Sequence, residues 1–295
     1  MKIHIAGIGG TFMAGLARIA VELGHSVEGS DAGVYPPMSD QLSELGIKVH
    51  QGYRADAITD DIDMVVIGNA LSRGNALVEY VLSQQIPYTS GPEWLKNSVL
   101  QHRHVIAVSG THGKTTVTSL IAWLLDQAGT DPGFLIGGVA ENFGVSARLG
   151  DGQYFVIEAD EYDTAFFDKR SKFIHYLPRT LVINNLEFDH ADIFDNLGDI
   201  ARQFHHLIRT LPQEAVIFYP HDDQNIQALF NEGLWSVTKS FGDRAGADIE
   251  ISERNDTTRE LTLTLNADGS FKFPLPLFGA HNALNTAAAI GVAIE

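Results

Sequence analysis

The chain has 295 residues, enough for two domains, and its 44% hydrophobic content predicts a folded globular protein. Its formal net charge of −17 argues against a nucleic-acid partner, which would need a basic face, although local cations and backbone dipoles can still bind a nucleotide. The lack of cysteine excludes disulfides and thiolate metal sites. No signal peptide and no bilayer-spanning apolar run are present, so we expect no membrane partner and a cytoplasmic location.

Short apolar strands and helices alternate over the first hundred residues. We expect strands at residues 3–6, 26–30 and 64–67, a further strand end near residue 90, and helices that end near residue 23 or span 38–46, 75–85 and 93–100. Strand and helix alternating at this spacing predict a parallel sheet with crossover helices. Residues 1–98 are therefore expected to form one Rossmann-like, doubly wound domain.

A glycine turn follows the first strand and has the form of a phosphate site. Its sequence is Gly7-Ile8-Gly9-Gly10-Thr11-Phe12, so the dinucleotide fingerprint fails at the third glycine, where Phe12 stands. Asp31 ends the second strand, where it could accept a hydrogen bond from a ribose or a base. The turn alone leaves three interpretations open: NAD binding, binding of another nucleotide diphosphate, or a purely structural turn.

A second strand, turn and helix begin near residue 105 and predict a phosphate cradle. In such a turn, backbone N–H groups converge on phosphate oxygens, Lys114 neutralises the β- and γ-phosphates, and the Thr115 hydroxyl reaches Mg²⁺. Val108 stands where the strict motif has its first glycine, and an ordinary strand-turn-helix connection is the alternative. The residues expected to bind the nucleotide here are Gly110, Thr111, His112, Gly113, Lys114, Thr115 and Thr116.

Acidic residues follow the buried strands expected at residues 154–157 and 181–183. Ligands of open α/β sheets lie outside the carboxyl ends of strands, which makes these acids candidate Mg²⁺ ligands. A catalytic Mg²⁺ needs only one or two protein carboxylates, so most of them must do something else, and Glu158 is the first candidate. His190 is left open as a metal ligand, a proton shuttle or a loop histidine. The candidates are Glu158, Asp160, Glu161, Asp163, Asp189 and His190.

The last third of the chain changes pattern. After a helix at 197–210 and a strand at 215–219, residues 259–265 and 270–273 predict an antiparallel edge hairpin with a turn between them. An alanine-rich helix then runs to Glu295 without a stop signal, from which we expect a following domain. Residues 99–295 are expected to form a P-loop ATPase-type α/β domain with this small antiparallel edge.

Five motifs occur in the order typical of the Mur ligases, the ATP-dependent amide-forming enzymes of peptidoglycan synthesis. They are Gly7-Ile8-Gly9-Gly10-x-x-Met13, Gly110-Thr111-His112-Gly113-Lys114-Thr115-Thr116, Glu158-Ala159-Asp160-Glu161, Asn185-Leu186-Glu187-Phe188-Asp189-His190 and His281-Asn282-x-x-Asn285. The segments 162–170 and 184–195 most resemble the branch of murein peptide ligases. Enzymes of that branch join L-Ala-γ-D-Glu-meso-diaminopimelate to UDP-N-acetylmuramate in cell-wall peptide recycling.

The resemblance implies a role for each matching residue. Lys114, Glu158 and His190 would be the catalytic residues. Lys114 and Thr115 would bind the ATP phosphates and a first Mg²⁺, while Glu158 and His190 would bind a second. His281 and Asn285 would contact adenine. The UDP-sugar would be held by Gly9, Gly10, Thr11, Phe12 and Met13, with Asp31 near the uridine.

Two departures from the family pattern stand out. Residues 191–208 contain no lysine, whereas several Mur enzymes carry a carbamylated lysine there, and the family's third domain is missing. We therefore expect an ATP-dependent ligase that works through an acyl phosphate, with a peptide specificity that these residues do not set. The alternatives are the ligase that adds L-alanine to the same nucleotide, an NAD-dependent oxidoreductase, and a UDP-sugar binding module with an idle ATPase half.

Overall fold

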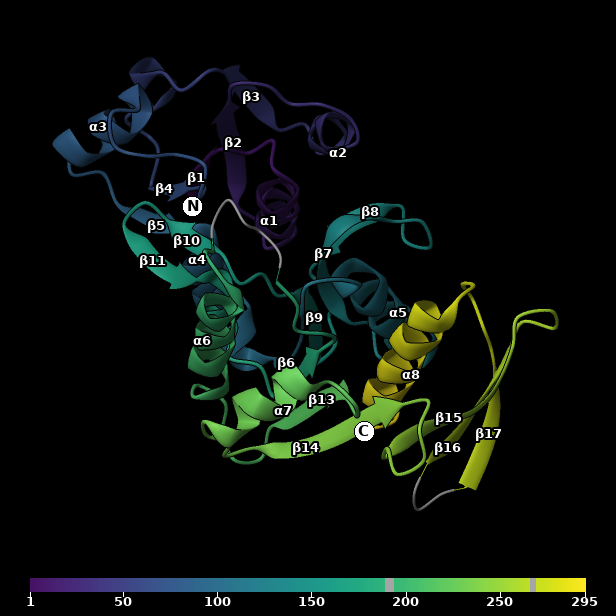
Figure 1. The fold of residues 1–295 in the computed structure, drawn as a ribbon. Helices are drawn as coiled ribbons and strands as arrows, with labels where there is room; N and C mark the ends of the chain where they lie inside the picture. The colour runs from purple at the N-terminus through teal and green to yellow at the C-terminus, as the bar shows by residue number, and fades with distance from the viewer. Residues whose placement is uncertain (189–193, 266–268) are drawn as a thin grey trace.

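The computed structural model describes residues 1–188, 194–265 and 269–295, which form two large β-sheets flanked by helices and a small two-stranded sheet (Figure 1). The predicted α/β fold is confirmed. His190 and the turn expected at 266–268 lie outside the described residues. Within the described part of the chain, no helix is both long and apolar enough to cross a membrane.

The first sheet is parallel throughout, with the strand order β3-β2-β1-β4-β5. The chain order reverses at the central strand, so a crevice opens at its carboxyl end, where the glycine turn lies. The strands are β1 (Lys2–Ala6), β2 (Ser26–Asp31), β3 (Lys48–Gln51), β4 (Met64–Ile67) and β5 (Tyr88–Ser90). The helices of this part are α1 (Thr11–Glu22), α2 (Met38–Glu44), α3 (Ala76–Ser83) and α4 (Gly91–Ser98).

The second sheet has ten strands in the order β17-β16-β15-β14-β13-β12-β6-β9-β7-β8. Its strands are β6 (His104–Ser109), β7 (Gly133–Ala140), β8 (Val145–Arg148), β9 (Tyr154–Glu158), β12 (Thr180–Ile183), β13 (Val216–Pro220), β14 (Val237–Gly242), β15 (Ile249–Asn255), β16 (Glu260–Leu265) and β17 (Gly269–Pro274). The strands from β15 through β7 pair in parallel, and the pairs at both edges are antiparallel. The predicted edge hairpin is thus present as β16 and β17, but it continues the main sheet through β15.

Four helices accompany the second sheet: α5 (Lys114–Gln127), α6 (Leu197–Ile208), α7 (Gln224–Asn231) and α8 (Ala280–Ile294). Helices α5 and α8 lie side by side in Figure 1 and pack against each other. A separate hairpin, β10 (Asp163–Ala165) and β11 (Asp168–Ser171), follows the acidic end of β9. Short 3₁₀ helices are η1 (Ala55–Ala57), η2 (Leu100–His102) and η3 (Lys172–His175).

Helix α1 joins the two parts of the molecule, because it packs against β7 and β8 of the second sheet (Figure 1). The contact is close at Gly15, where a Cβ atom would lie 3.1 Å from the Cβ of Ala147 and 3.5 Å from Cγ of Leu135. The buried Gln41 side chain adds a polar link, since its Oε1 accepts from the hydroxyl of Ser146 at 3.0 Å. One hydrophobic cluster therefore runs through both parts.

Substituting Gly15 tests this packing. We expect Gly15→Val to lower the free energy of unfolding by about 1–3 kcal/mol, because the branched side chain must displace Ala147 and Leu135. Gly15→Ala is the control: its single methyl group fits with a small shift, and the loss of a mid-helix glycine offsets that strain by up to about 1 kcal/mol. Urea denaturation measures both variants. Equal stabilities for Val and Ala at this position would contradict the close contact.

Candidate functional site

The predicted phosphate cradle is a tight turn between β6 and α5. Gly110 has a φ of 128° and Gly113 a φ of 79°, backbone conformations that side-chain-bearing residues rarely adopt. Strand β6 lies between β9 and β12, so the turn sits at the carboxyl ends of three parallel strands. The local sequence therefore gives the turn its shape, and the sheet surrounds it with the residues that follow β9 and β12.

Lys114 is buried and folds back over this turn. Its Nζ donates to the carbonyl oxygen of Gly110 at 2.9 Å and lies 3.5 Å from Glu161 Oε2 and 3.9 Å from Asp160 Oδ1. The acids after β9 thus surround the cation of the cradle. An anion in the turn would meet a positive charge that is already held in position.

Glu158 at the end of β9 faces the first turn of α5. Its carboxylate accepts from the Thr115 hydroxyl at 3.0 and 3.1 Å and from the backbone N–H of Gly137 at 2.8 Å. Burial and the nearby Asp160 raise the pKa of Glu158. The carboxylate and the hydroxyl are hard oxygen donors of the kind that Mg²⁺ prefers.

No cluster of three or more His, Asp or Glu side chains that could hold a metal ion occurs in the described ranges 1–188, 194–265 and 269–295. Mg²⁺ does not require one, because it keeps several waters and binds substrate phosphates alongside one or two carboxylates. Thr115 and Glu158 therefore fit a Mg²⁺ ion. His190, the other predicted ligand, lies outside the described residues.

Two asparagines after β12 hold the cradle in shape, a role that the sequence did not indicate. Asn185 accepts from the N–H of His112 at 2.8 Å and donates to its carbonyl oxygen at 3.0 Å. Asn184 donates to the same carbonyl oxygen at 2.9 Å and to Asn285 Oδ1 at 2.8 Å. Their position directly after a buried strand was the one available signal.

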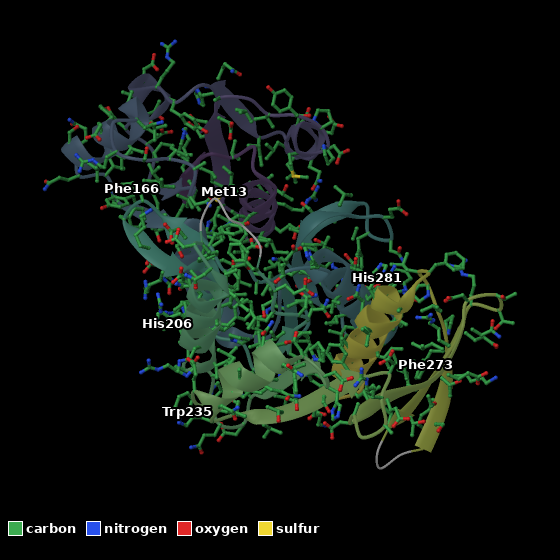
Figure 2. All side chains as sticks on the ribbon, viewed as in Figure 1. Met13, Phe166, His206, Trp235, Phe273 and His281 are labelled. Carbon is green, nitrogen blue, oxygen red and sulfur yellow. The ribbon has the colours of Figure 1, made fainter. Side chains whose placement is uncertain are left out.

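The two residues predicted to contact adenine differ in their surroundings. Asn285 is buried on α8, and a Cβ atom on Gly113 would lie 2.9 Å from its Oδ1. His281 lies one helical turn earlier, near the N-terminal end of α8, and is exposed; Figure 2 labels it. The structure therefore brings Asn285 to the cradle and leaves His281 at its margin.

The glycine turn of the first sheet is held by Asp31. The Asp31 carboxylate accepts from the N–H of Gly9 at 2.9 Å and from that of Gly33 at 3.0 Å. Gly10 precedes α1 and provides no side-chain cap for that helix. The first N–H groups of α1 can therefore bind an anion.

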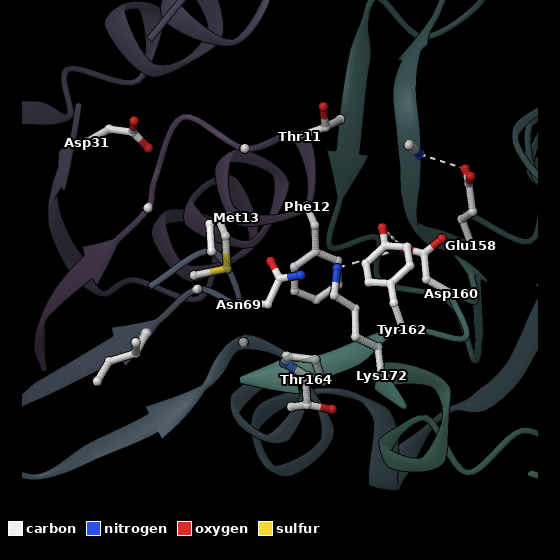
Figure 3. Close-up of a pocket in the computed structure, with 18 of the residues that line it drawn as sticks. Thr11, Phe12, Met13, Asp31, Asn69, Glu158, Asp160, Tyr162, Thr164 and Lys172 are labelled. Carbon is white, nitrogen blue, oxygen red and sulfur yellow. Dashed lines mark hydrogen bonds and ion pairs between the residues drawn. The ribbon is translucent and has the colours of Figure 1, made fainter. Parts of the chain in front are cut away.

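A cavity of about 420 Å³ lies between the glycine turn of the first sheet and the end of β9 (Figure 3). Gly10, Thr11, Phe12, Met13 and Asp31 line one side, and Gly137, Glu158, Asp160, Tyr162 and Lys172 line the other. Figure 2 labels Met13, which lies where the two parts of the molecule meet. Residues predicted to hold the sugar nucleotide and the predicted metal ligand Glu158 therefore line one cavity, and Glu158 accepts from Thr115 of the cradle.

Lys172 is one of the lining residues that sequence reasoning missed. It is 5% exposed and begins η3, and burial lowers the pKa of its ammonium group. Nothing in the sequence around it differs from an ordinary surface hairpin, so only the fold reveals its position.

Comparison with known proteins agrees with this architecture. Residues 2–103 match the catalytic domain of the Mur ligase family, and residues 108–293 match the Mur ligase middle domain. The second match alone covers more than half of the chain. The chain therefore belongs to the Mur ligase family.

Individual relatives fall into two groups. The UDP-N-acetylmuramate–L-alanyl-γ-D-glutamyl-meso-2,6-diaminoheptanedioate ligase of Haemophilus influenzae is 56% identical over 99% of this chain and 66% of its own length. The crystal structure of a ligase of the same name from Neisseria meningitidis superposes with a TM-score of 0.93 at 50% identity, covering 99% of this chain and 93% of that one. A UDP-N-acetylmuramate–L-alanine ligase of Neisseria meningitidis is 36% identical over 100% of this chain and 62% of its own length. The chain thus spans about two thirds of the length of these curated relatives.

The asparagine clamp on the cradle can be tested at Gly113. A Cβ atom there would lie 2.6 Å from Asn184 Nδ2, and we expect Gly113→Ala to cost about 2–4 kcal/mol of unfolding free energy. Gly129→Ala is the control, because Gly129 has a similar φ of 76° but no atom within 4 Å of the added carbon. It should cost only about 1–2 kcal/mol. Equal losses in chemical denaturation would show that the asparagines do not pack tightly on the turn.

Proposed function

We propose that the protein of which this chain is a part is an ADP-forming ligase. It joins the tripeptide L-Ala-γ-D-Glu-meso-diaminopimelate to UDP-N-acetylmuramate in cell-wall peptide recycling, in the cytoplasm. The observation that supports this most directly is the cavity that joins Gly10–Met13 to Glu158 beside the cradle. A reaction between a sugar acid and ATP needs two nucleotide sites whose reacting ends meet. The hydrogen bond at 3.0 Å from Thr115 of the cradle to Glu158, which lines this cavity, supports such a meeting point.

The proposed reaction proceeds through an acyl phosphate. The lactyl carboxylate of UDP-N-acetylmuramate attacks the γ-phosphorus of ATP and ADP leaves. The amine of the peptide's alanine then attacks the acyl carbon, and phosphate leaves. Two anions meet in the first step, so the protein's main contribution is electrostatic, from the cradle N–H groups and Lys114.

Mg²⁺, when bound, neutralises phosphate charge and polarises the γ-phosphoryl group. In this proposal Thr115 would hold a first ion beside Lys114 and the ATP phosphates, and Glu158 and His190 would hold a second. The cradle residues 110–116 bind the ATP phosphates, with Asn285 and His281 towards the adenine. Lys114 is oriented by Gly110 and by the acids after β9.

The sugar nucleotide occupies the first sheet in this proposal. The N-terminus of α1, with Gly9, Gly10, Thr11, Phe12 and Met13, receives the diphosphate, and Asp31 lies towards the uridine. Phe12 in place of a third glycine favours a UDP-sugar over NAD, because the fingerprint for a dinucleotide is incomplete. We assign residues 1–98 to the sugar-nucleotide domain and 99–295 to the ATP domain.

The choice of the tripeptide over free L-alanine rests on the relatives, since identity is 56% to a tripeptide ligase and 36% to an alanine ligase. A chimera tests it: this chain joined to the remaining segment of the Haemophilus influenzae relative and assayed with UDP-N-acetylmuramate and tripeptide. The comparison is a fusion of this chain to the remaining segment of the Neisseria meningitidis alanine ligase, assayed with UDP-N-acetylmuramate and L-alanine. We expect a higher kcat/KM for ADP release in the chimera, because this chain should dock better on the segment of its own branch. A more active fusion would favour the second ligase, and no ATP turnover in either protein would refute the proposal.

In the same chimera, Lys114→Ala should lower the rate of ADP release about 100-fold or more, because the transferring phosphoryl group loses its buried cation. Retention of near-normal turnover would show that Lys114 does not act on the phosphates. Lys169→Ala is the matched control, since this lysine is exposed and pairs with Asp163 away from the cradle.

Adjacent glycines on β7 test the role of Glu158. A Cβ atom on Gly137 would lie 2.7 Å from Glu158 Oε2, whereas one on Gly138 would have Thr115 Cγ2 at 3.8 Å as its nearest neighbour. We expect Gly137→Ala to weaken Mg²⁺-ATP binding about 10-fold by displacing the carboxylate, and Gly138→Ala to leave it within about 2-fold. Calorimetric titration with and without Mg²⁺ measures the effect. A Gly137→Ala loss that persists without Mg²⁺ would argue against metal binding by Glu158.

A further inference from the structure

Lys172 places a positive charge at the cavity between the glycine turn of the first sheet and the end of β9. It follows Ser171, the last residue of β11, and its backbone N–H donates to the carbonyl oxygen of Tyr162 at 3.0 Å. This anchors the start of η3 against the acidic segment after β9. The side chain then extends into the cavity wall, where Figure 3 shows its nitrogen directed towards Phe12 and Tyr162.

Aromatic rings hold the Lys172 ammonium group from two sides. Its Nζ lies 4.3 Å from the ring centre of Tyr162 and 5.0 Å from that of Phe12, which belongs to α1. Asp160 Oδ2 is 3.8 Å away, beyond hydrogen-bond distance, and that oxygen accepts from the Tyr162 hydroxyl at 2.6 Å. Ring faces attract a cation without accepting conventional N–H hydrogen bonds. The ammonium group thus pairs with one carboxylate and two ring faces, and it can turn an N–H donor towards a ligand in the cavity.

The charges around the cavity single out this lysine. The acidic lining residues are Asp31, Glu158 and Asp160, and Lys172 is the one lysine or arginine among the described residues that line it. An anionic group in the middle of the cavity would be repelled by the three carboxylates. Because the side chain is nearly buried, solvent screens its attraction for an anion only weakly.

We propose that Lys172 binds the carboxylate of the sugar acid and holds it between the N-terminus of α1 and the cradle. The inference rests on the proposed function and adds a residue that recognises the acid itself. The diphosphate at α1 and the carboxylate at Lys172 fix the sugar at two points. Its reacting oxygen is then directed towards the side of the cavity where Glu158 lies.

The neighbouring basic residues do not share this position. Lys169 is 70% exposed and pairs with Asp163 at 2.8 Å, and Arg170 is exposed and pairs with Asp168. Both charges are satisfied on the hairpin β10–β11 itself. Lys169 therefore provides a control with the same change of charge outside the cavity.

Two sugar nucleotides test the inference on the chain as it is. UDP-N-acetylglucosamine lacks the lactyl carboxylate of UDP-N-acetylmuramate but keeps the uridine, the diphosphate and the hexose. In isothermal titration calorimetry the unmodified chain should prefer the acid. Lys172→Met should weaken binding of the acid about 10- to 100-fold, the range expected for a lost charge-assisted hydrogen bond, and leave UDP-N-acetylglucosamine within about 2-fold. Lys169→Met should change neither.

The outcomes separate this inference from the proposed function. If the unmodified chain binds neither nucleotide, both fail. If it prefers the acid and Lys172→Met keeps that preference, or weakens both ligands equally, the lysine is structural and the inference alone is wrong. Lys172→Met removes one of the two lysines near Asp160, so the double variant Asp160→Asn with Lys172→Met is measured beside it. Loss of the preference in the double variant, with a circular dichroism spectrum like that of the unmodified chain, supports the inference, and a retained preference overturns it.

Discussion

The packing of α1 against β7 and β8 determines where the two halves of the candidate site lie relative to each other. One end of α1 carries the glycine turn, and its flank carries Gly15, which lets β8 approach closely. A polar link reinforces the apolar contact, because Glu22 accepts from the N–H of Leu149 at 2.7 Å. Strand β7 also carries Gly137, whose N–H holds the Glu158 carboxylate. A shift of α1 on this surface would therefore change the distance between the glycine turn and the cradle.

The candidate site is proposed to bind anions although the chain as a whole carries a large negative charge. A protein of formal charge −17 is proposed to bind two polyanions, and it surrounds their meeting point with carboxylates. The cations present are few and buried: Lys114 over the cradle and Lys172 between two rings. Each lies within 4 Å of Asp160, which makes this carboxylate a common neighbour of both lysines. Phosphate groups and the backbone N–H groups of two turns complete a site in which position matters more than the number of charges.

Local sequence was sufficient for the features that depend on local physics. Apolar β-branched runs predicted β1, β4, β6 and β12, and the glycines predicted the tight turns after β1 and β6, because strand propensity and positive φ values are properties of neighbouring residues. Strand β8 was missed because its sequence Val-Ser-Ala-Arg contains no apolar run and the strand is defined by its pairing with β7. The asparagine clamp and Lys172 were missed for a similar reason: Asn184 meets His112 across 72 positions of sequence, and Lys172 meets Phe12 only when α1 has docked.

Two buried polar groups beside the cradle, one of them the Glu158 carboxylate, lower the stability of the candidate site. The pKa of Glu158 is raised by burial and by Asp160, so the ionised carboxylate is disfavoured in the folded chain although Thr115 and Gly137 donate to it. A buried oxygen of Asn184, Oδ1, also has no hydrogen-bond partner within the described part of the chain. Both atoms border the cradle, and both would gain from a cation or a donor brought by a ligand. The packing of α1 and the asparagines holds these unfavourable groups in place, which is the arrangement expected of a site whose folded form is completed by what it binds.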